Sequence, residues 1–483
     1  MSNHSRTVSL LSVTALCIIN ITLTFFLLQS PTCDPSEIPE ELKYEAVTTW
    51  DVESQPEDNK STQCLPPHTY LNPKMNLINT SHSRENILNL DIRLGRYDNR
   101  RLFKTFDTVL IGTRFAELST TNLVCLATQT SLEKLHSLVQ VAHHWTGSIS
   151  VALYSAGDEE FEALQKYIVF LRKCYTPVLE RINFSLAMPR SKLPSKQPRS
   201  FEPPMDFGCS RPEATLNDLV NKISKEHTNW RVRNVYPQNH MRNLARKNCQ
   251  TDWVFLTDID IIPSIGLANS INLFLRDTER CDKCAYVIPT YEIDTRVRFP
   301  GNKTELVRLA RKGLARPFHW KVFIHNQYAT NFTRWVLDVA PESKNYKNII
   351  AGKAYISHNV TDFEFLYEPF YIAKDIVPPH DERFMGYGYT RNTQGHSISN
   401  RQIVGIDPFR FEQILVYEMF IAGYQFKVLS PVFTIHWGLQ TRKSRSVWRE
   451  RQNIINRRQF EQFKKEIYTK YMHNTLGLIN TFY

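Results

Sequence analysis

Hydrophobic and polar positions divide the 483-residue chain into regions with different patterns. Residues 8–28 are almost wholly apolar, and a helix of that length is about 30 Å long, enough to cross a bilayer. Residues 29–95 are rich in proline, acidic and polar residues without a sustained period, which indicates a stem. From residue 96 to residue 483, apolar positions recur with the periods of helices and strands, which predicts one large folded region.

The folded region begins with alternating strand-like and helix-like segments. Apolar runs predict strands at 122–128, 148–154, 182–187 and 253–256. Amphipathic periods predict helices at 131–145, 159–174 and 238–247. Strands that alternate with helices indicate an α/β fold with a doubly wound, mostly parallel sheet. The segment Met188–Glu213, rich in proline, serine and lysine, interrupts this order and predicts a surface insertion.

The charges on either side of the apolar run predict its orientation in a membrane. Arg6 and the terminal amine precede it, whereas the segment that follows is acidic. The positive-inside rule therefore keeps residues 1–7 in the cytosol and places the folded region in the lumen. The apolar run is long for a cleaved signal peptide and no small-residue cleavage site follows it. We therefore expect an uncleaved signal-anchor and a single-pass type II membrane protein.

Glycosylation sequons and cysteines agree with a luminal location. The sequons stand at Asn59, Asn79, Asn183, Asn302, Asn331 and Asn359. Eight of the nine cysteines lie outside the apolar run, and an even number in an oxidising compartment predicts up to four disulfides, whose pairing cannot be deduced. Cys281 and Cys284 have no second cysteine or histidine pair to complete a zinc site, so they are expected to form a disulfide.

Composition and charge exclude some classes of protein. A hydrophobic fraction of 42% with 12% aromatic residues is typical of a globular protein and not of a disordered one. The net charge of +11 is spread along the chain, with a cluster from Arg442 to Lys470. A luminal protein is not expected to bind nucleic acid. Its basic groups either attract anionic nucleotide sugars or acidic glycans, or are solvated helix faces.

Asp258 and Asp260 are the candidate metal ligands. They follow the strand predicted at 253–256, and in extended backbone residues i and i+2 point to the same side. Carboxylate oxygens suit Mn²⁺ or Mg²⁺, and ligands of doubly wound sheets lie beyond the carboxyl ends of strands. The pattern therefore predicts a metal site that holds a nucleotide diphosphate. The alternative is a pair of solvated aspartates in a turn.

Six segments carry a resemblance to a known family. They are Tyr236–Arg246, Phe255–Ser264, Thr330–Trp335, Tyr367–Phe370, Asp381–Gly388 and Phe433–Trp437. In this order, over roughly residues 120–440, the chain resembles glycosyltransferase family 49. The resemblance implies a GT-A fold, a UDP-sugar donor, Mn²⁺ as cofactor and inversion at the anomeric carbon. It also implies a Golgi enzyme that acts in protein O-linked mannosylation.

The resemblance suggests roles for particular residues. His436, in a strand-like segment, is the candidate third metal ligand, and the alternative is a hydrogen-bonded core histidine. Because inversion needs a base for the acceptor hydroxyl, Asp381 is the first candidate and Glu382 the second. The alternative is structural, with Glu382 paired to Arg383 and Asp381 capping a turn.

Arg242 and Asn243 are candidate contacts for the nucleotide or the sugar. Both lie on the helix predicted at 238–247, directly before the strand that carries the aspartates. Arginine grips phosphate or a uronate carboxylate with two hydrogen bonds, which suits a nucleotide-sugar donor. An exposed arginine on an amphipathic helix is the alternative.

The family resemblance implies a Mn²⁺-dependent inverting glycosyltransferase. Its expected reaction moves glucuronic acid from UDP-glucuronate to a xylose-ended O-mannosyl glycan on a glycoprotein, at the Golgi membrane. Two alternatives stay open: transfer of N-acetylglucosamine or another hexose, and a catalytically silent scaffold or glycan-binding protein. A homo-oligomer, or a hetero-oligomer with other Golgi transferases, also stays open. The complete set of acidic residues argues against the silent alternative.

Overall fold

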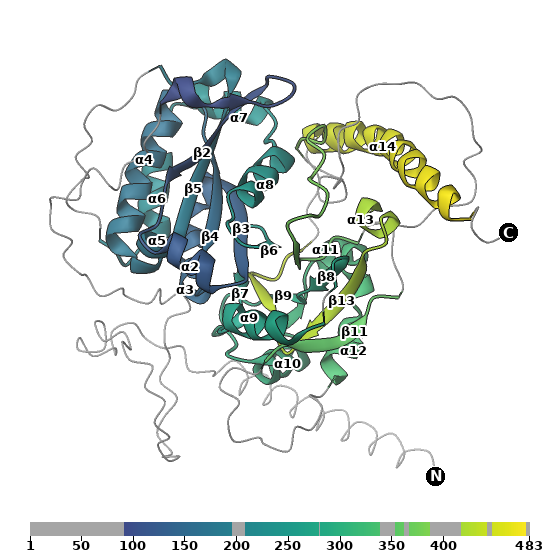
Figure 1. Ribbon diagram of the computed structural model, residues 1–483. Helices are drawn as coiled ribbons and strands as arrows, with labels where there is room; N and C mark the ends of the chain where they lie inside the picture. Colours follow the sequence, from purple (N-terminus) through teal and green to yellow (C-terminus); the bar gives the residue numbers. More distant parts are fainter. Residues whose placement is uncertain are drawn as a thin grey trace, which may run out of the picture. The chain divides into compact units, whose positions relative to one another are not determined.

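The computed structural model describes residues 91–195, 208–279, 281–338, 353–361, 367–386, 417–441 and 447–479 (Figure 1). All of them belong to one of the two compact units of the chain, Met75–Tyr483. The signal-anchor predicted at 8–28, the stem up to residue 90 and the sequons at Asn59 and Asn79 lie outside these ranges. Among the helices of the described ranges, none has both the length and the apolar character needed to span a membrane.

A large mixed sheet forms the centre of this unit. In the described residues it has ten strands in the order β1-β2-β5-β4-β3-β6-β12-β8-β13-β11. Their bounds are β1 Arg96–Tyr97, β2 Phe103–Leu110, β3 Val124–Ser131, β4 Ile149–Tyr154, β5 Ile182–Pro189, β6 Trp253–Leu256, β8 Cys284–Val287, β11 Tyr355–Asn359, β12 Tyr371–Lys374 and β13 Gln425–Ser430. Strands β5, β4, β3 and β6 are parallel, whereas β2 and β12 pair with them antiparallel. The parallel part confirms the predicted doubly wound order, and the whole sheet is mixed.

Helices cover both faces of the parallel strands. On one face lie α2 Phe115–Thr121, α3 Leu138–His144, α4 Gly157–Cys174, α5 Thr176–Arg181 and α6 Pro212–Val220; α8 Gln238–Lys247 covers the other (Figure 1). Alternate strand residues serve the two faces: Leu126 packs in the core beneath α3 and α4, and Ala127 packs against Met241 of α8. Because both faces are buried, these strands are continuously apolar in sequence.

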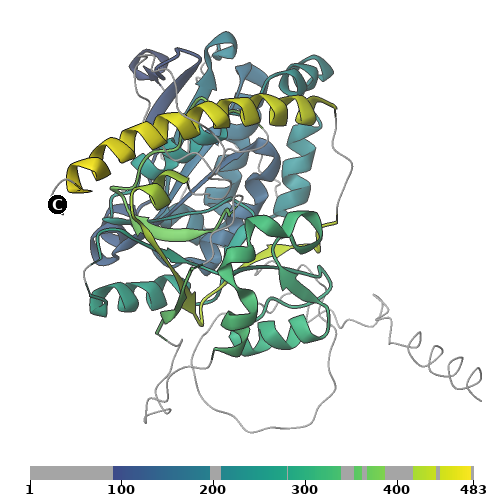
Figure 2. The same ribbon diagram turned by 90° about the vertical axis from the view of Figure 1, so that its right-hand side faces the viewer.

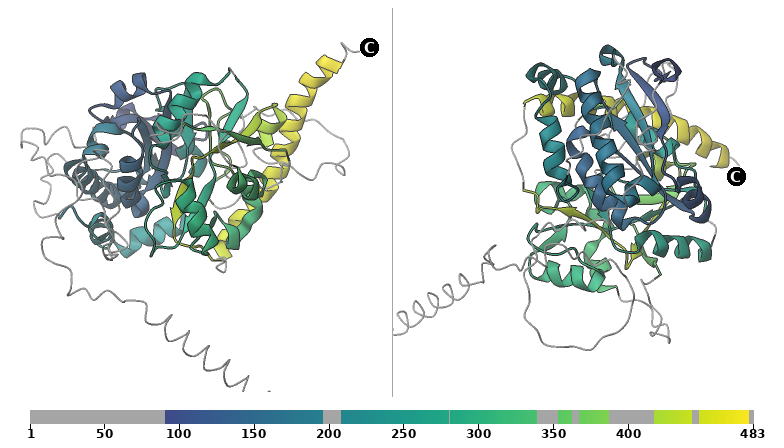
Figure 3. Two further views of the ribbon diagram at one scale, coloured as in Figure 1. Left: turned by 90° about the horizontal axis from the view of Figure 1, so that it is seen from below. Right: turned by 90° about the vertical axis from the view of Figure 1, so that its left-hand side faces the viewer.

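The second half of the chain adds a smaller sheet beside the first half (Figure 3). Its strand order is β10-β9-β14-β7, with β7 Ile261–Pro263, β9 Thr290–Ile293, β10 Ala315–Pro317 and β14 Thr434–Trp437. Its surrounding helices include α9 Leu267–Asp277, α10 Lys303–Arg311, α11 Trp320–Phe323, α12 Phe332–Leu337 and α13 Tyr417–Ile421. The long α14, Val447–Ile479, runs across the unit in Figure 2. It packs Phe460 and Phe463 into the hydrophobic core that contains Tyr291 of β9 and Phe426 of β13.

Three disulfides join described cysteines. Cys125 of β3 pairs with Cys249 after α8, and Cys174 at the end of α4 pairs with Cys209. The third bond joins Cys281 to Cys284, which confirms the predicted disulfide. Cys33 and Cys64 lie outside the described residues.

Several predicted boundaries change in the structure. The helix predicted at 131–145 is a 3-10 segment, η5 Leu132–Ser137, followed by the short α3. The insertion predicted at Met188–Glu213 is smaller, because Met188 and Pro189 complete β5 and α6 already begins at Pro212. Residues 196–207 of that segment lie outside the described ranges. The short α7, Lys225–Arg233, precedes α8 and was not expected.

Candidate active site

The two aspartates lie just beyond the carboxyl end of β6. The backbone N–H of Thr257 still donates to the carbonyl of Ala127 in β3, 3.0 Å away. The chain then turns, and the N–H of Ile261 donates to the carbonyl of Asp258 at 3.0 Å. Asp258 and Asp260 therefore flank a turn with buried Ile259 between them, whereas the sequence analysis expected extended backbone.

Two side chains, those of Lys134 and His436, approach the carboxylate of Asp260. Its Oδ2 lies 2.5 Å from Nζ of Lys134, which stands on η5 after β3. The same oxygen lies 3.7 Å from Nε2 of His436 on β14. Burial raises the pKa of Asp260, but His436 and the Lys134 ammonium lower it more. The pKa of this carboxyl therefore lies well below its usual range. Asp260 is therefore a carboxylate held in a cationic environment.

Arg242 approaches the other aspartate. Its Nη2 lies 3.7 Å from Oδ1 of Asp258, and its Nη1 donates to Oδ1 of Asn239 at 3.0 Å. The Arg242 side chain is 4% exposed, so it is not a solvated arginine on an amphipathic helix. A buried guanidinium beside a carboxylate is suited to hold phosphate or a uronate.

The donor set fits a divalent cation by type. Two carboxylates and an imidazole are ligands that Mn²⁺ accepts, and Asp260 already faces the ammonium of Lys134. Within the ranges that the structure describes, however, no three His, Cys, Asp or Glu side chains are close enough to hold a metal ion as they stand.

A buried row of polar residues supports His436. Arg316, Glu292 and His436 are register partners across β10, β9 and β14. Nη2 of Arg316 lies 3.0 Å from Oε2 of Glu292, which is fully buried and also accepts the backbone N–H of Gln440. Nε2 of Gln440 lies 3.1 Å from Nε2 of His436. This row fixes the position of the imidazole beside Asp260.

Asp381 is tied to an arginine. It is 3% exposed, and its Oδ2 accepts hydrogen bonds from Nε and Nη2 of Arg383 at 2.8 and 2.6 Å. Its Oδ1 accepts the backbone N–H of Arg383 at 2.9 Å. The other edge of Arg383 binds Glu466 of α14, with Nη2 and Oε2 2.6 Å apart. Asp381 thus has the structural pairing that the sequence analysis gave to Glu382.

Glu382 is more accessible than Asp381. Its side chain is 34% exposed, and its Oε1 accepts a hydrogen bond from Nδ2 of Asn243 at 3.1 Å. Asn243 also exchanges hydrogen bonds of 2.8 Å with the backbone of His380. Asn243, a candidate donor contact from its sequence, therefore orients the segment that carries Glu382.

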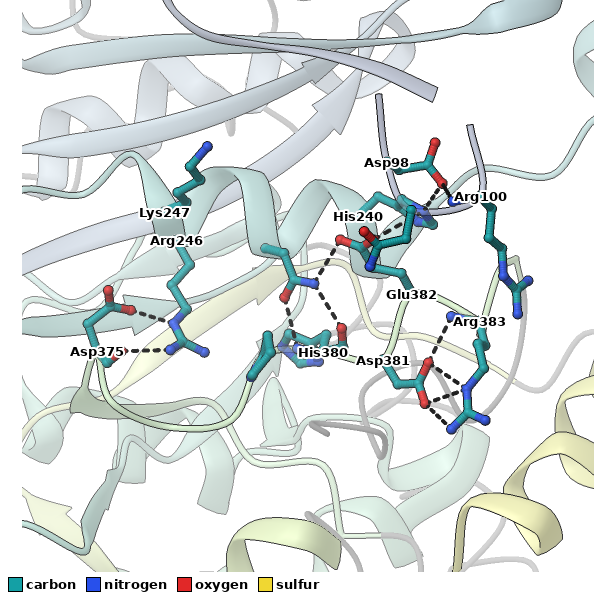
Figure 4. A pocket seen from close by; sticks show the side chains of 13 residues that line it. Asp98, Arg100, His240, Arg246, Lys247, Asp375, His380, Asp381, Glu382 and Arg383 are labelled. Atoms are coloured by element: carbon teal, nitrogen blue, oxygen red, sulfur yellow. Dashed lines mark hydrogen bonds and ion pairs between the residues drawn. The ribbon is translucent and has the colours of Figure 1, made fainter. Parts of the chain in front are cut away.

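A cavity of about 540 Å³ opens beside Glu382; we call it the α8 cavity (Figure 4). It lies between α8, the turn at 98–100 and the segment 375–383. Its lining consists of Asp98, Asn99, Arg100, His240, Asn243, Arg246, Lys247, Asp375, Pro379, His380, Asp381, Glu382 and Arg383. Almost all of these side chains are polar, so the cavity suits a ligand with many hydrogen-bonding groups.

A second, small cavity adjoins the aspartates. It measures about 20 Å³ and is lined by Arg242, Leu256, Thr257, Glu368, Pro369, Tyr371 and His380. Sequence reasoning assigned no role to Glu368, although it belongs to the segment Tyr367–Phe370 that carries the family resemblance. It also missed Lys134 and Gln440, for which no local pattern gives a signal.

Comparisons with known proteins identify relatives of the chain among glycosyltransferases. The family described as glycosyl-transferase for dystroglycan matches residues 123–472. Beta-1,4-glucuronyltransferase 1 of Homo sapiens is 30% identical over 353 residues, which cover 72% of this chain and 76% of that protein. The Danio rerio protein of the same name is 28% identical over 352 residues, covering 72% and 74%. Xylosyl- and glucuronyltransferase LARGE2 of Mus musculus is 26% identical over 318 residues, covering 65% of this chain and 34% of that protein.

Proposed function

The chain belongs to the family described as glycosyl-transferase for dystroglycan, and from this premise we propose that it transfers glucuronic acid from UDP-glucuronate to a glycan acceptor. The observation that carries the proposal is the convergence of Lys134 and His436 on Asp260, with Arg242 beside Asp258. Charged groups of both signs at the carboxyl end of β6 are what a nucleotide diphosphate and its counter-ion require.

Mn²⁺ is the proposed cofactor. Asp258, Asp260 and His436 would hold it, and when bound it would stabilise the negative charge that develops on the diphosphate leaving group. Lys134 supplies fixed positive charge to the same group from a protein side chain. Gln440 contacts His436, and Glu292 binds both Arg316 and the backbone of Gln440, so these residues help to hold the imidazole near Asp260.

Glu382 is the proposed base of an inverting reaction. The acceptor hydroxyl oxygen attacks the anomeric carbon, the bond from that carbon to the phosphate oxygen breaks, and its electron pair leaves with UDP. The hydroxyl proton passes to the carboxylate of Glu382. Asp381 was the first candidate in the sequence, but its oxygens accept four hydrogen bonds from Arg383, so the more exposed Glu382 is the better acceptor of a proton.

The names of relatives and the charges of the site support the proposed donor. The names of the human and mouse relatives both contain glucuronyltransferase, and buried Arg242 supplies the cation that a uronate needs. The proposed acceptor is a xylose-ended O-mannosyl glycan, as the family resemblance implies. Transfer of N-acetylglucosamine or another hexose is the alternative, because it uses the same diphosphate site.

The proposed location is the Golgi membrane, with the apolar segment 8–28 as a signal-anchor, residues 1–7 in the cytosol and the catalytic region luminal. Disulfides between Cys125 and Cys249 and between Cys174 and Cys209 support passage through an oxidising compartment. The proposed stem, residues 29–95, would hold the catalytic region away from the bilayer.

Release of UDP tests the proposed function. Full-length protein purified in detergent is incubated with Mn²⁺, a β-xyloside and each member of a panel of UDP-sugars. Release with UDP-glucuronate alone supports the proposal, whereas release with another donor changes the sugar but keeps the reaction class. Absence of release with every donor, together with unimpaired binding of UDP, would favour the silent glycan-binding alternative. The double variant Asp258→Asn, Asp260→Asn is the matched control and should neither bind UDP with Mn²⁺ nor release it.

A further inference from the structure

The α8 cavity carries no net charge. Its lining has four acidic and four basic side chains, namely Asp98, Asp375, Asp381, Glu382, Arg100, Arg246, Lys247 and Arg383. Most of these charges are paired: Arg246 with Asp375, Arg383 with Asp381, and Lys247 with Asp107 at 2.8 Å. Acidic and basic side chains are equal in number in this lining, so it has no large excess of positive charge that would select an anion such as a nucleotide. It presents fixed donors and acceptors to a neutral polar ligand.

The lining of the cavity includes a buried histidine, His240, that lies between two carboxylates (Figure 4). Nε2 of His240, whose side chain is 2% exposed, lies 3.5 Å from Oδ2 of Asp98 and 3.5 Å from Oε2 of Glu382. Neither ring nitrogen makes a hydrogen bond of normal geometry with another described residue. The ring also packs edge-on against Phe103, with centroids 4.9 Å apart, so its position is fixed.

Asp98 is itself held in place by backbone N–H groups of the segment that follows it. Its Oδ1 accepts the backbone N–H of Phe103 at 2.6 Å, and its Oδ2 accepts that of Arg100 at 3.1 Å. Burial raises the pKa of Asp98, but His240 and these N–H groups lower it to about 2, so the side chain is a carboxylate. Asp98 and Glu382 both approach Nε2 of His240, so this one nitrogen lies between the fixed carboxylate of Asp98 and the carboxylate of Glu382 and can hold Glu382 in place.

The α8 cavity adjoins the diphosphate site. His380 lines both the α8 cavity and the small cavity that contains Arg242 and Thr257. Asn243, which orients Glu382, is the neighbour of Arg242 on α8, and Arg242 reaches Asp258. A ligand in the α8 cavity would therefore meet Glu382 close to the edge of the donor site. The volume of about 540 Å³ is within the range of small-molecule sites.

We propose that the α8 cavity binds a neutral saccharide of the glycan acceptor, with His240 as a positioning residue that holds Glu382 against the reacting hydroxyl. This inference rests on the glycosyl transfer proposed above. Glu382 accepts the hydrogen bond of the reacting hydroxyl, and Asn99 and Arg100 at the rim offer an amide and a guanidinium to further hydroxyls. The reacting sugar is thus selected by hydrogen bonds and not by charge.

Steady-state kinetics of single variants test the inference. With UDP-glucuronate and a β-xyloside as probes, Arg100→Ala should raise the acceptor KM roughly tenfold, the loss expected for a hydrogen bond to a charged group. His240→Gln should instead lower kcat, because Glu382 loses its support. Both variants should leave the donor KM and the affinity for UDP within about twofold of the parent. Arg101→Ala is the matched control, because Arg101 is the exposed neighbour of Arg100 and does not line the cavity.

Two further measurements separate the possible outcomes. Saturation-transfer NMR with methyl β-xyloside should detect binding to the parent and a weaker signal with Arg100→Ala. If the parent transfers sugar but both cavity variants keep their acceptor KM and kcat, the acceptor lies elsewhere and this inference is wrong. If the parent binds UDP but transfers no sugar to any acceptor, the proposed function itself is wrong. Thermal unfolding midpoints identify a variant that fails to fold, in which case His240→Asn, which keeps a polar side chain, replaces His240→Gln.

Discussion

Nζ of Lys134 lies 2.5 Å from Oδ2 of Asp260, although the two residues are 126 positions apart in the chain. They meet because β3 and β6 are parallel neighbours, so the segments that follow them emerge at the same edge of the sheet. The contact places a cation at the site where a diphosphate is proposed to bind, and it lowers the pKa of the carboxyl.

Removing the charge of Lys134 should weaken donor binding. Lys134→Met keeps the length of the side chain, and we expect the donor KM to rise roughly tenfold, the loss typical of a charge-assisted hydrogen bond. The acceptor KM should stay within about twofold. Lys134→Arg, which keeps the charge, is the control and should recover part of the donor affinity. A change in the acceptor KM alone would assign Lys134 to the acceptor side of the site.

Substitution of Glu382 should reduce turnover, whereas substitution of Asp381 should reduce the stability of the fold. Glu382→Gln should lower kcat by about 10²–10⁴-fold with an unchanged unfolding midpoint, because a general base contributes that much. Asp381→Asn should instead destabilise the fold by about 1–3 kcal/mol, since Arg383 keeps Glu466 but loses its buried partner. Urea unfolding and turnover measured on both variants distinguish these effects. If Asp381→Asn is as stable as the parent but has no turnover, Asp381 and not Glu382 is the general base.

The sequence predicted the parts of the site that depend on local pattern. The strand at 253–256 and the helix at 238–247 are both present with these bounds, because apolar period and a following turn are local properties. For Cys281 and Cys284 the sequence predicted a disulfide role and not a zinc site, because no second ligand pair accompanies them, and the structure joins them to each other. The two aspartates stand where expected, although on a turn instead of extended backbone.

The sequence could not predict contacts that depend on register or on distant segments. Lys134 meets Asp260 only because of the order of β3 and β6, and Glu292 meets Arg316 and Gln440 only through the register of the smaller sheet. The pairing of Arg383 with Asp381 involves Glu466 of α14, more than 80 residues away. A pattern of residue types contains no record of such pairings, whereas the packing of the folded chain determines them.

Gln440 should control the strength of metal binding through His436. Its Nε2 lies 3.1 Å from Nε2 of His436, so Gln440→Ala removes a partner that orients the imidazole. Loss of such a partner costs metal sites about 10–100-fold in affinity, and we expect a rise of that order in the Mn²⁺ concentration for half-maximal activity. Calorimetric titration of Mn²⁺ in the presence of UDP provides a readout independent of turnover. Gln462→Ala on α14 is the control, and equal effects of the two variants would rule out an orienting role.

His144 should make the free energy of unfolding depend on pH. Its Nδ1 lies 2.9 Å from the carbonyl oxygen of Pro263 in β7, and burial lowers its pKa from 6.5 to about 4. The unfolded chain therefore binds a proton near pH 6.5 that the folded chain takes up only near pH 4. Stability should fall by about 2–3 kcal/mol as the pH drops through this window and change no further from this group below it.

Chemical unfolding at a series of pH values tests the role of His144. His144→Asn keeps a donor near the Nδ1 position and cannot titrate, so its free energy of unfolding should vary less between pH 6.5 and pH 4. His325→Asn, at an exposed histidine, should keep the acid dependence of the parent. An unchanged slope for His144→Asn would show that other groups cause the acid dependence.

The described sequons should differ in glycan occupancy. Asn183 lies in β5 with a fully buried side chain, and its Nδ2 donates to the carbonyl of Asn248 at 3.3 Å. A glycan on this nitrogen would break the hydrogen bond and could not fit in the core, whereas Asn302, Asn331 and Asn359 are exposed. We therefore expect site-specific mass spectrometry of protein from a secretory host to find glycans only at the three exposed positions among these four. A glycan mapped to Asn183 in folded, active protein would contradict its place in β5, because every residue of this strand is buried.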